Sequence, residues 1–380
     1  MFWVMFDTST KLDYYRDVQN LLALPNGSTI RYDYRENHIT AGALAEAGAD
    51  RMGKVLLAYV QHPAFRKGGD DPLGPLPYDG SLWIPTRIAE LSHVRMKGNR
   101  TYLDLRLTGY PSNNIDALRR ILKPLADAGE VPFAKWVATS EQNDDFELLH
   151  EGESSANWTA VIDRIGAAPS QFEGDSFWRI SKIARGDDRI PIEPDLRDHI
   201  ETEDGQQVVT RVKAIYPVFE LEKIAIEVES RMPEAGAELA GEDRGAGRSV
   251  SFASSGGGPL KGFDKRSLRL RRYAQEWMET EVKGTDRTDA QTCHLTLTTA
   301  PAGPDDYPVG PELEILFEVA KKAGRAFWAI ILALAAVAFG SGVVAADEIA
   351  WRLVFLVLAA LLALLAIYLW TGTIRLPGIR

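Results

Sequence analysis

The sequence predicts an α+β protein in which a β-rich cytoplasmic region precedes a C-terminal two-helix transmembrane hairpin. Three observations lead to this fold class: two long apolar segments near the C-terminus, alternating apolar and polar residues in the preceding chain, and one cysteine in 380 residues. Alternation with a period of two is typical of half-buried strands. A single cysteine excludes an internal disulfide and is typical of a reducing compartment.

The two apolar segments, residues 326–346 and 353–370, contain no charged residue. Each is long enough, or nearly so, to cross a hydrocarbon core of about 30 Å as a helix. Basic residues flank the outer ends of the pair, at Lys321, Lys322, Arg325, Arg375 and Arg380. Because positive charge stays in the cytoplasm, both termini and the large N-terminal region are predicted to lie inside.

The cytoplasmic part is expected to contain two β-rich regions, residues 1–170 and 171–307. In the first, Trp83–Met96 and Thr101–Thr108 predict a hairpin. Leu103, Leu105 and Leu107 would share one face of its second strand. A helix is expected near 115–128, because Ser112, Asn113 and Asn114 offer an N-cap before an apolar periodic segment.

Two further predictions concern a loop within the second region and the connection between that region and the membrane. Residues 233–262 are rich in Gly, Ser, Ala and Glu, which predicts a mobile loop. Residues 311–325 predict a juxtamembrane coupling helix, since apolar residues recur there at steps of three and four. That helix either continues into the first span, which would transmit domain motion into the bilayer, or bends at Gly324, which would merely anchor the protein.

Enzymatic motifs are missing from the sequence, so we expect no enzyme, cofactor or metal. The six histidines include no His-Glu-x-x-His pair, and no Cys-x-x-Cys or Gly-x-Ser-x-Gly is present. The Gly256–Gly262 segment lacks the Gly-Lys-Ser/Thr ending of a phosphate loop. An anchored hydrolase whose carboxylates meet only in the folded chain stays an alternative.

A basic segment stands out in a chain with a net charge of −10. If residues 268–273 form a strand, Arg269, Arg271 and Tyr273 share a face that suits a phosphate backbone and a stacked base. The alternative is a basic strand paired with Glu227 and Glu229. The candidate nucleotide-binding residues here are Lys261, Lys265, Arg266, Arg269, Arg271, Arg272 and Tyr273.

A weaker basic group surrounds the predicted hairpin turn, at Arg95, Lys97 and Arg100. Lys97 and Arg100 are therefore added to the candidate nucleotide-binding residues. The alternative is an ordinary turn whose charges are only solvated.

The predicted spans contain candidate pore residues. Neither has an internal Lys, Asp, Glu or His, which argues against a proton relay or a coupled transporter. Small residues in the first span, among them Gly340 and Ser341, allow close helix packing. In an oligomer, Asp347 and Glu348 would ring the outer mouth and favour cations. The alternative is an inert anchor pair.

This layout of an acidic β-rich sensor, no catalytic motif and a C-terminal hairpin resembles the membrane effectors of nucleotide-signalled bacterial antiphage systems, of the CBASS-like or Hailong type. The resemblance implies an oligomer, in the Hailong-type case a tetramer, that permeabilises the inner membrane. It also implies a nucleotide or oligonucleotide ligand and a partner nucleotidyltransferase. No individual residue is carried over.

Two function hypotheses follow. The first is a ligand-gated membrane effector that forms an ion-permeable pore, controlled by a nucleotide or oligonucleotide bound to the cytoplasmic region. The second is a membrane-anchored binding or scaffold protein whose hairpin only localises it.

Overall fold

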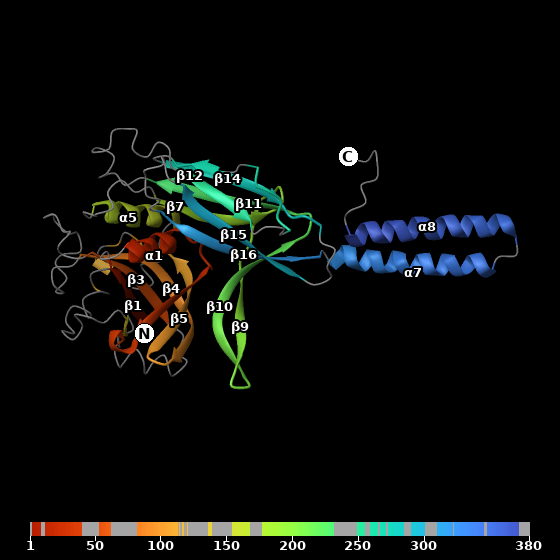
Figure 1. Ribbon diagram of the computed structural model, residues 1–380. Coiled ribbons are helices and arrows are strands. Elements are labelled where there is room, and N and C mark those ends of the chain that lie inside the picture. Colours follow the sequence, from red (N-terminus) through yellow and green to blue (C-terminus); the bar gives the residue numbers. More distant parts are fainter. Residues whose placement is uncertain are drawn as a thin grey trace.

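The computed structural model describes most of the chain, in segments separated by gaps. Described are residues 2–8, 12–39, 53–61, 82–112, 114, 116–117, 120, 136–138, 154–167, 177–231, 249–254, 259–264, 267–270, 273–284, 290–300, 310–321, 323–345 and 348–371. Within these segments, strands form three sheets and two long helices extend away from them at the C-terminal end (Figure 1).

The first sheet has the strand order β2-β5-β4-β3-β1-β6. Its strands are β1 (Phe2–Thr8), β2 (Thr29–Arg35), β3 (Lys54–Gln61), β4 (Leu82–Lys97), β5 (Arg100–Gly109) and β6 (Trp136–Ala138). Helix α1 (Leu12–Ala23) joins β1 to β2, and a short 3-10 turn, η1 (Glu36–His38), follows β2. The predicted hairpin is confirmed as β4 and β5, and the three leucines of β5 are fully buried.

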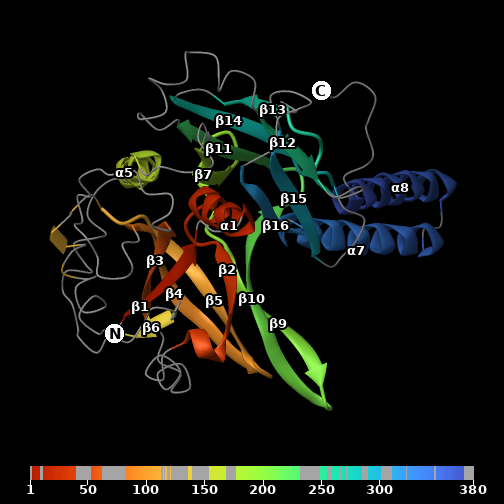
Figure 2. The same ribbon diagram turned by 60° about the vertical axis from the view of Figure 1, so that its left-hand side comes forward.

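The second sheet, here called the membrane-side sheet, has the order β13-β12-β15-β16-β10-β9. It contains β9 (Asp195–Glu203), β10 (Gln206–Phe219), β12 (Ser249–Ser254), β13 (Ser267–Arg269), β15 (Gln291–Ala300) and β16 (Glu312–Ala320). The third sheet, of order β14-β11-β7-β8, contains β7 (Phe177–Arg185), β8 (Ile190–Pro191), β11 (Lys223–Arg231) and β14 (Tyr273–Glu281). Helix α5 (Ser154–Ala167) lies beside it (Figure 2).

One apolar core joins the three sheets. Leu105 of the first sheet, Ile180 of the third and Phe317 of the membrane-side sheet belong to the same buried cluster. The predicted division at residue 170 separates the strands of the first sheet from those of the other two. The regions on its two sides nevertheless share a core, which limits independent movement of either one.

The predicted coupling helix over 311–325 is wrong, because residues Glu312–Ala320 form the strand β16 and the helix begins only at Ala323. The alternate residues Leu313, Ile315, Phe317 and Val319 are buried. On the opposite face Glu312 and Glu314 are exposed, whereas Leu316 is half-buried and apolar. An interior strand with apolar residues on both faces imitates helical periodicity.

The predicted loop over 233–262 is also corrected in part, since Ser249–Ser254 form β12 and Leu260 is buried. The remainder of that prediction, residues 233–248 and 255–258, lies outside the described residues. So does most of the predicted helix 115–128, although Asn114 accepts a hydrogen bond from the Ala117 N–H at 3.1 Å, as an N-cap does.

The C-terminal helices α7 (Ala323–Ala345) and α8 (Ile349–Thr371) lie side by side, with the rings of Phe339 and Phe355 6.2 Å apart. Within α8, Ile349–Ile367 is long and apolar enough to cross a membrane. The comparable described stretch of α7, Ile330–Ser341, is shorter. Large apolar side chains on both helices are exposed, which in water is unfavourable and indicates a lipid or protein environment.

Candidate functional site

A cleft of about 580 Å³ runs along the free edge of β2, at the junction of the first sheet and the membrane-side sheet. This volume lies in the range of ordinary ligand sites, roughly 300–1,000 Å³. The walls are formed by β2, by α1 and by the beginning of β16. The lining residues are Asp17, Asn20, Leu21, Leu24, Thr29, Ile30, Arg31, Tyr32, Asp33, Tyr34, Arg35, His38, Arg100, Arg211, Glu312, Leu313 and Glu314.

Four arginines make the β2 side of the cleft basic. Arg100 pairs with Asp33 and Arg31 pairs with Asp104. Arg35 and Arg211 are exposed, and neither has an ion-pair partner among the described residues. Two such guanidinium groups suit a phosphate or carboxylate, which they can bind through charge-assisted hydrogen bonds.

Aromatic and acidic side chains also line the cleft. The rings of Tyr32 and Tyr34 are stacked, with their centroids 6.1 Å apart. The opposite wall contains Asp17, Glu312 and Glu314, of which Glu314 pairs with His294. The cleft therefore has a basic side and an acidic side, and favours a ligand that carries an anionic group together with neutral or donor groups.

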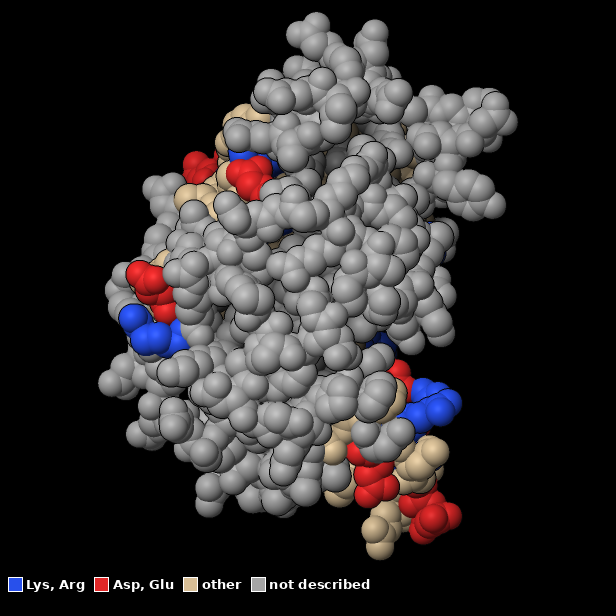
Figure 3. Space-filling view, turned by 90° about the vertical axis from the view of Figure 1, so that its left-hand side faces the viewer, with Lys and Arg blue, Asp and Glu red and all other residues tan. Residues whose placement is uncertain are grey.

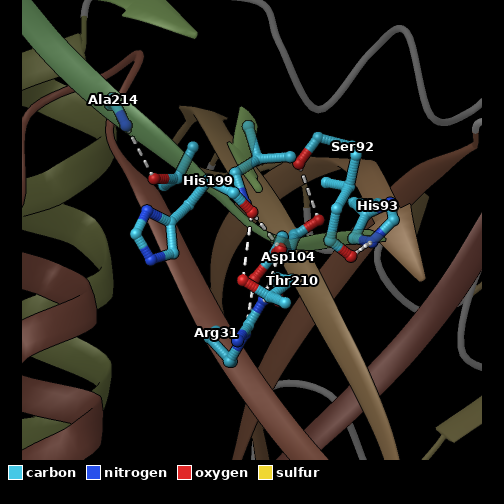
Figure 4. A network of polar contacts seen from close by, with 10 residues as sticks. Arg31, Ser92, His93, Asp104, His199, Thr210 and Ala214 are labelled. Carbon is cyan, nitrogen blue, oxygen red and sulfur yellow. Dashed lines mark hydrogen bonds and ion pairs between the residues drawn. The ribbon is translucent and has the colours of Figure 1, made fainter. Parts of the chain in front are cut away.

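A polar network holds β10 against the first sheet beside this cleft (Figure 4). Arg31 donates two hydrogen bonds of 2.7 Å to Asp104, which is 1% exposed, and a third of 2.5 Å to the carbonyl of Thr210. Asp104 also accepts from the N–H of Val212 at 2.8 Å. Asp104 thus connects β2, β5 and β10, and stabilises the irregularity of β10 between Val209 and Arg211 that places Arg211 at the cleft.

The weaker predicted group is divided by the structure. Arg100 lines the cleft, whereas Lys97 points to the end of the β9–β10 hairpin. There Glu203 accepts from Arg95 at 2.5 Å and from Lys97 at 2.9 Å. Arg95 and Lys97 lower the pKa of Glu203 from its usual range. These ion pairs fix the end of the hairpin, so the three cations are not merely a solvated turn.

The stronger predicted group is described only in part. Lys261 pairs with Glu281, and Arg269 is exposed in β13. Lys265, Arg266, Arg271 and Arg272 lie outside the described residues. The interpretation of 268–273 as one strand is wrong, because β13 ends at Arg269 and Tyr273, 59% exposed, begins β14 of another sheet.

The acidic residues proposed as its partners are bound elsewhere. Glu229 accepts from Arg179, at 2.7 and 2.9 Å, and from Ser155. Glu227 accepts from Ser181 and Gln275. Among the described residues neither carboxylate forms an ion pair with the basic segment, so the alternative of a basic strand neutralised by these two glutamates finds no support there.

Two arginines, Arg87 and Arg179, are buried in the core. The Arg87 side chain is fully buried and donates to the carbonyl of Leu24, just after α1, and to Asn26, while its guanidinium lies 3.7 Å from the centre of the Tyr110 ring. Burial lowers the pKa of Arg87, and the nearby positive charge of Arg179 lowers it further. Carbonyls at a helix C-terminus favour a cation, which gives Arg87 a structural role.

The candidate pore residues lie in and between the C-terminal helices. A side chain at Gly340 would meet no atom within 4 Å, and the Ser341 hydroxyl donates to the carbonyl of Ala338 at 2.7 Å. Glu348 is exposed at the start of the second helix, and Asp347 lies outside the described residues. Their role in a pore stays a prediction.

Comparisons with known proteins identify no relative. No protein-family model and no curated protein matches this chain. Among solved structures, the chain is similar to a Bacteroides ovatus GH5 xyloglucanase in complex with a XXXG heptasaccharide, at 8% identity and a TM-score of 0.18. The match covers 28% of this chain and 17% of the xyloglucanase, and it carries no argument about fold or activity.

Sequence reasoning missed most of the cleft. Arg31, Tyr32 and Arg35 belong to a segment with visible strand alternation, so its charged and aromatic residues were a usable signal. Arg211 and Glu312 had none, because they reach the cleft from strands that are about 180 and 280 residues further along the chain and are brought there by sheet packing.

Proposed function

We propose that this protein is a ligand-gated membrane effector, in which an anionic ligand of the nucleotide or oligonucleotide class binds the cytoplasmic region and controls an ion-permeable pore. The supporting observation is the course of β16. Its first residues, Glu312 to Glu314, line the cleft, and it ends at Ala320, three residues before the first residue of α7. One strand thus links the cleft to the membrane end of the molecule.

The basic side of the cleft supplies the proposed ligand specificity. Arg35 and Arg211 would bind phosphate oxygens, and Tyr32 offers an aromatic face for a base. Because β16 and β10 are hydrogen-bonded neighbours in one sheet, a ligand that draws Arg211 toward β2 also acts on β16. A rigid strand is a more direct coupling element than the helix that the sequence predicted.

In this proposal α7 and α8 form a transmembrane hairpin in the bacterial inner membrane, with the sheets and both termini in the cytoplasm. Several copies would enclose the pore, with the small-residue helix α7 inside. The layout resemblance favours a role in antiviral defence with a nucleotidyltransferase partner. If the helices only localise the protein, the same cleft fits the alternative, a membrane-anchored binding or scaffold protein.

Charge reversal in the cleft tests the ligand site. Arg35→Glu and Arg211→Glu are each expected to weaken binding of a fluorescently labelled single-stranded DNA oligomer, measured by anisotropy at low salt. Loss of one charge-assisted contact, about 1.5–3 kcal/mol, corresponds to roughly tenfold or more in Kd. Both arginines are exposed, so the folded state should persist, and circular dichroism checks this.

Arg269→Glu is the matched control, because it makes the same charge change on an exposed residue of the basic segment that the sequence favoured. It is expected to leave the affinity within about twofold. If Arg269→Glu weakens binding and the two cleft variants do not, the ligand site lies at the basic segment and the cleft assignment is wrong.

A further inference from the structure

Among the described residues, no strand pairs with the outer edge of β9. β9 is the last strand of the membrane-side sheet, and its residues from Asp195 to Thr202 are all exposed. They include Leu196 and Ile200, which are 39% and 52% exposed. Natural proteins shorten, cover, pair or charge an edge of this length, because its free backbone groups recruit another strand. β9 is neither short nor covered by a described element, and its charged residues are of both signs.

Residues 195–214 of the β9–β10 hairpin, here called the arm, are fixed to the first sheet through β10 and the arm's end. Asp104 binds the N–H of Val212, Thr29 accepts from the N–H of Ala214 at 3.0 Å, and Arg95 binds Glu203. Ordering a flexible strand would oppose association. Because the arm is already held in place, this cost is small for β9.

Alternate residues of β9 direct their backbone N–H and C=O groups to the outer edge of the sheet. Thr210 donates to the carbonyl of His199 at 3.0 Å, so that carbonyl points into the hairpin. Successive residues of a strand direct their backbone groups to opposite edges. The N–H and C=O groups of Asp198, Ile200 and Thr202 therefore point to the open edge, where no described strand pairs with them.

We propose that β9 pairs antiparallel with β9 of a second copy of this chain, about a two-fold axis at Ile200. In this register Arg197 lies opposite Glu203, His199 lies opposite Glu201, and the two Ile200 side chains meet. Opposite charges at facing positions and an apolar pair at the centre are the features that stabilise cross-strand contacts.

The charges of β9 also discriminate against neighbouring registers. Moving the axis by one residue to His199 leaves every side chain on the same face of the sheet but places Asp195 opposite Glu203. Moving the axis to Glu201 places the Glu201 carboxylates of the two copies opposite each other. Both arrangements bring like charges together, which is destabilising. Arg197 and Glu203 already contact Glu318 and Arg95 within their own chain, so the facing pairs mainly select the register.

The position of the arm is compatible with two copies in one membrane. The arm runs crosswise to α7 and α8 in both ribbon views (Figures 1 and 2). In the space-filling view it projects at the lower right, with acidic and basic side chains on its surface (Figure 3). Two copies share one membrane if the two-fold axis, which is perpendicular to the arm, runs along the helix pair, because both pairs then leave the dimer on the same side.

A cysteine at the proposed axis tests the pairing in the full-length protein in detergent. The natural Cys293 is buried, and burial raises the pKa of its thiol to about 11, so at pH 8 it stays protonated and unreactive. Ile200→Cys is expected to give a covalent dimer on mild oxidation, because facing Cα atoms lie about 5.5 Å apart, within disulfide range.

Thr202→Cys is the matched control, since it is exposed in the same strand and points to the same face. In the proposed register its two copies lie about 13 Å apart, which is four residues of strand and too far for a disulfide. Dimer from Ile200→Cys alone supports the proposal. No dimer, or equal dimer from both variants, overturns it.

Ile200→Glu tests the pairing without a crosslink, because it places two carboxylates opposite one another. The dissociation constant of the dimer, measured by mass photometry in detergent, is expected to rise at least tenfold. An unchanged dissociation constant would overturn the pairing. This inference does not rest on the proposed function, because the arm can pair whether or not α7 and α8 form a pore.

Discussion

Replacing Arg179 by Met is expected to lower the free energy of unfolding by about 3–5 kcal/mol, the usual cost of removing one partner of a buried ion pair. The side chains of Arg179 and Glu229 are 4% and 2% exposed. The Arg179 guanidinium also lies 4.9 Å from the Trp158 ring and 5.1 Å from the Tyr110 ring. Without it, Glu229 stays buried with Ser155 as its remaining described partner.

Urea unfolding of the full-length protein, followed by tryptophan fluorescence, measures this loss. The double variant Arg179→Met with Glu229→Leu is the informative control, because replacing both members of a buried pair by apolar residues costs much less than replacing one. Lys261→Met, which removes a half-exposed partner of Glu281, should leave the midpoint unchanged. Equal destabilisation by the single and double variants would show that the pair matters for packing rather than for charge.

The sequence was sufficient for elements whose two faces meet different surroundings. Leu103, Leu105 and Leu107 alternate in β5 with Tyr102, Asp104 and Arg106, and that period of two identifies a strand. The apolar segments that became α7 and α8 were equally clear, because an uninterrupted run of that length has few alternatives. These local signals do not depend on how the sheets pack.

A strand with apolar residues on its second face gave a misleading signal. In β16 one face, with Leu313, Ile315 and Phe317, is buried, and the other face is exposed or half-buried but carries Leu316, so helical and strand patterns are satisfied at once. The segment 268–273 failed for a different reason, because a chain that passes from one sheet to another has no sequence feature marking the crossing. Of the cleft residues, Arg100 was among the predicted site residues, and Arg31, Tyr32 and Arg35 lay in a recognisable strand. Arg211 and Glu312 could not be predicted, because sheet packing alone brings them to the cleft.

Cells that produce the full chain are expected to lose their membrane potential when the proposed pore is open. Cells producing a variant in which an unrelated two-helix anchor replaces residues 323–371 should keep it. Both helices expose large apolar side chains along their length. In an anchor these side chains contact lipid, whereas in a pore they pack against the helices of other copies. A potentiometric dye, read with and without the neighbouring genes, measures the difference.

The boundary of the replaced segment decides whether this experiment is interpretable. A chain cut near Gly310 would lose β16, and with it four buried side chains of the shared core. Such a chain would fail through unfolding, whatever the helices do. Joining the unrelated anchor after Lys322 keeps every strand of the membrane-side sheet. Depolarisation by both the full chain and this hybrid would exclude a specific role of α7 and α8 in conduction. Defence activity that survives in the hybrid without depolarisation would favour the scaffold.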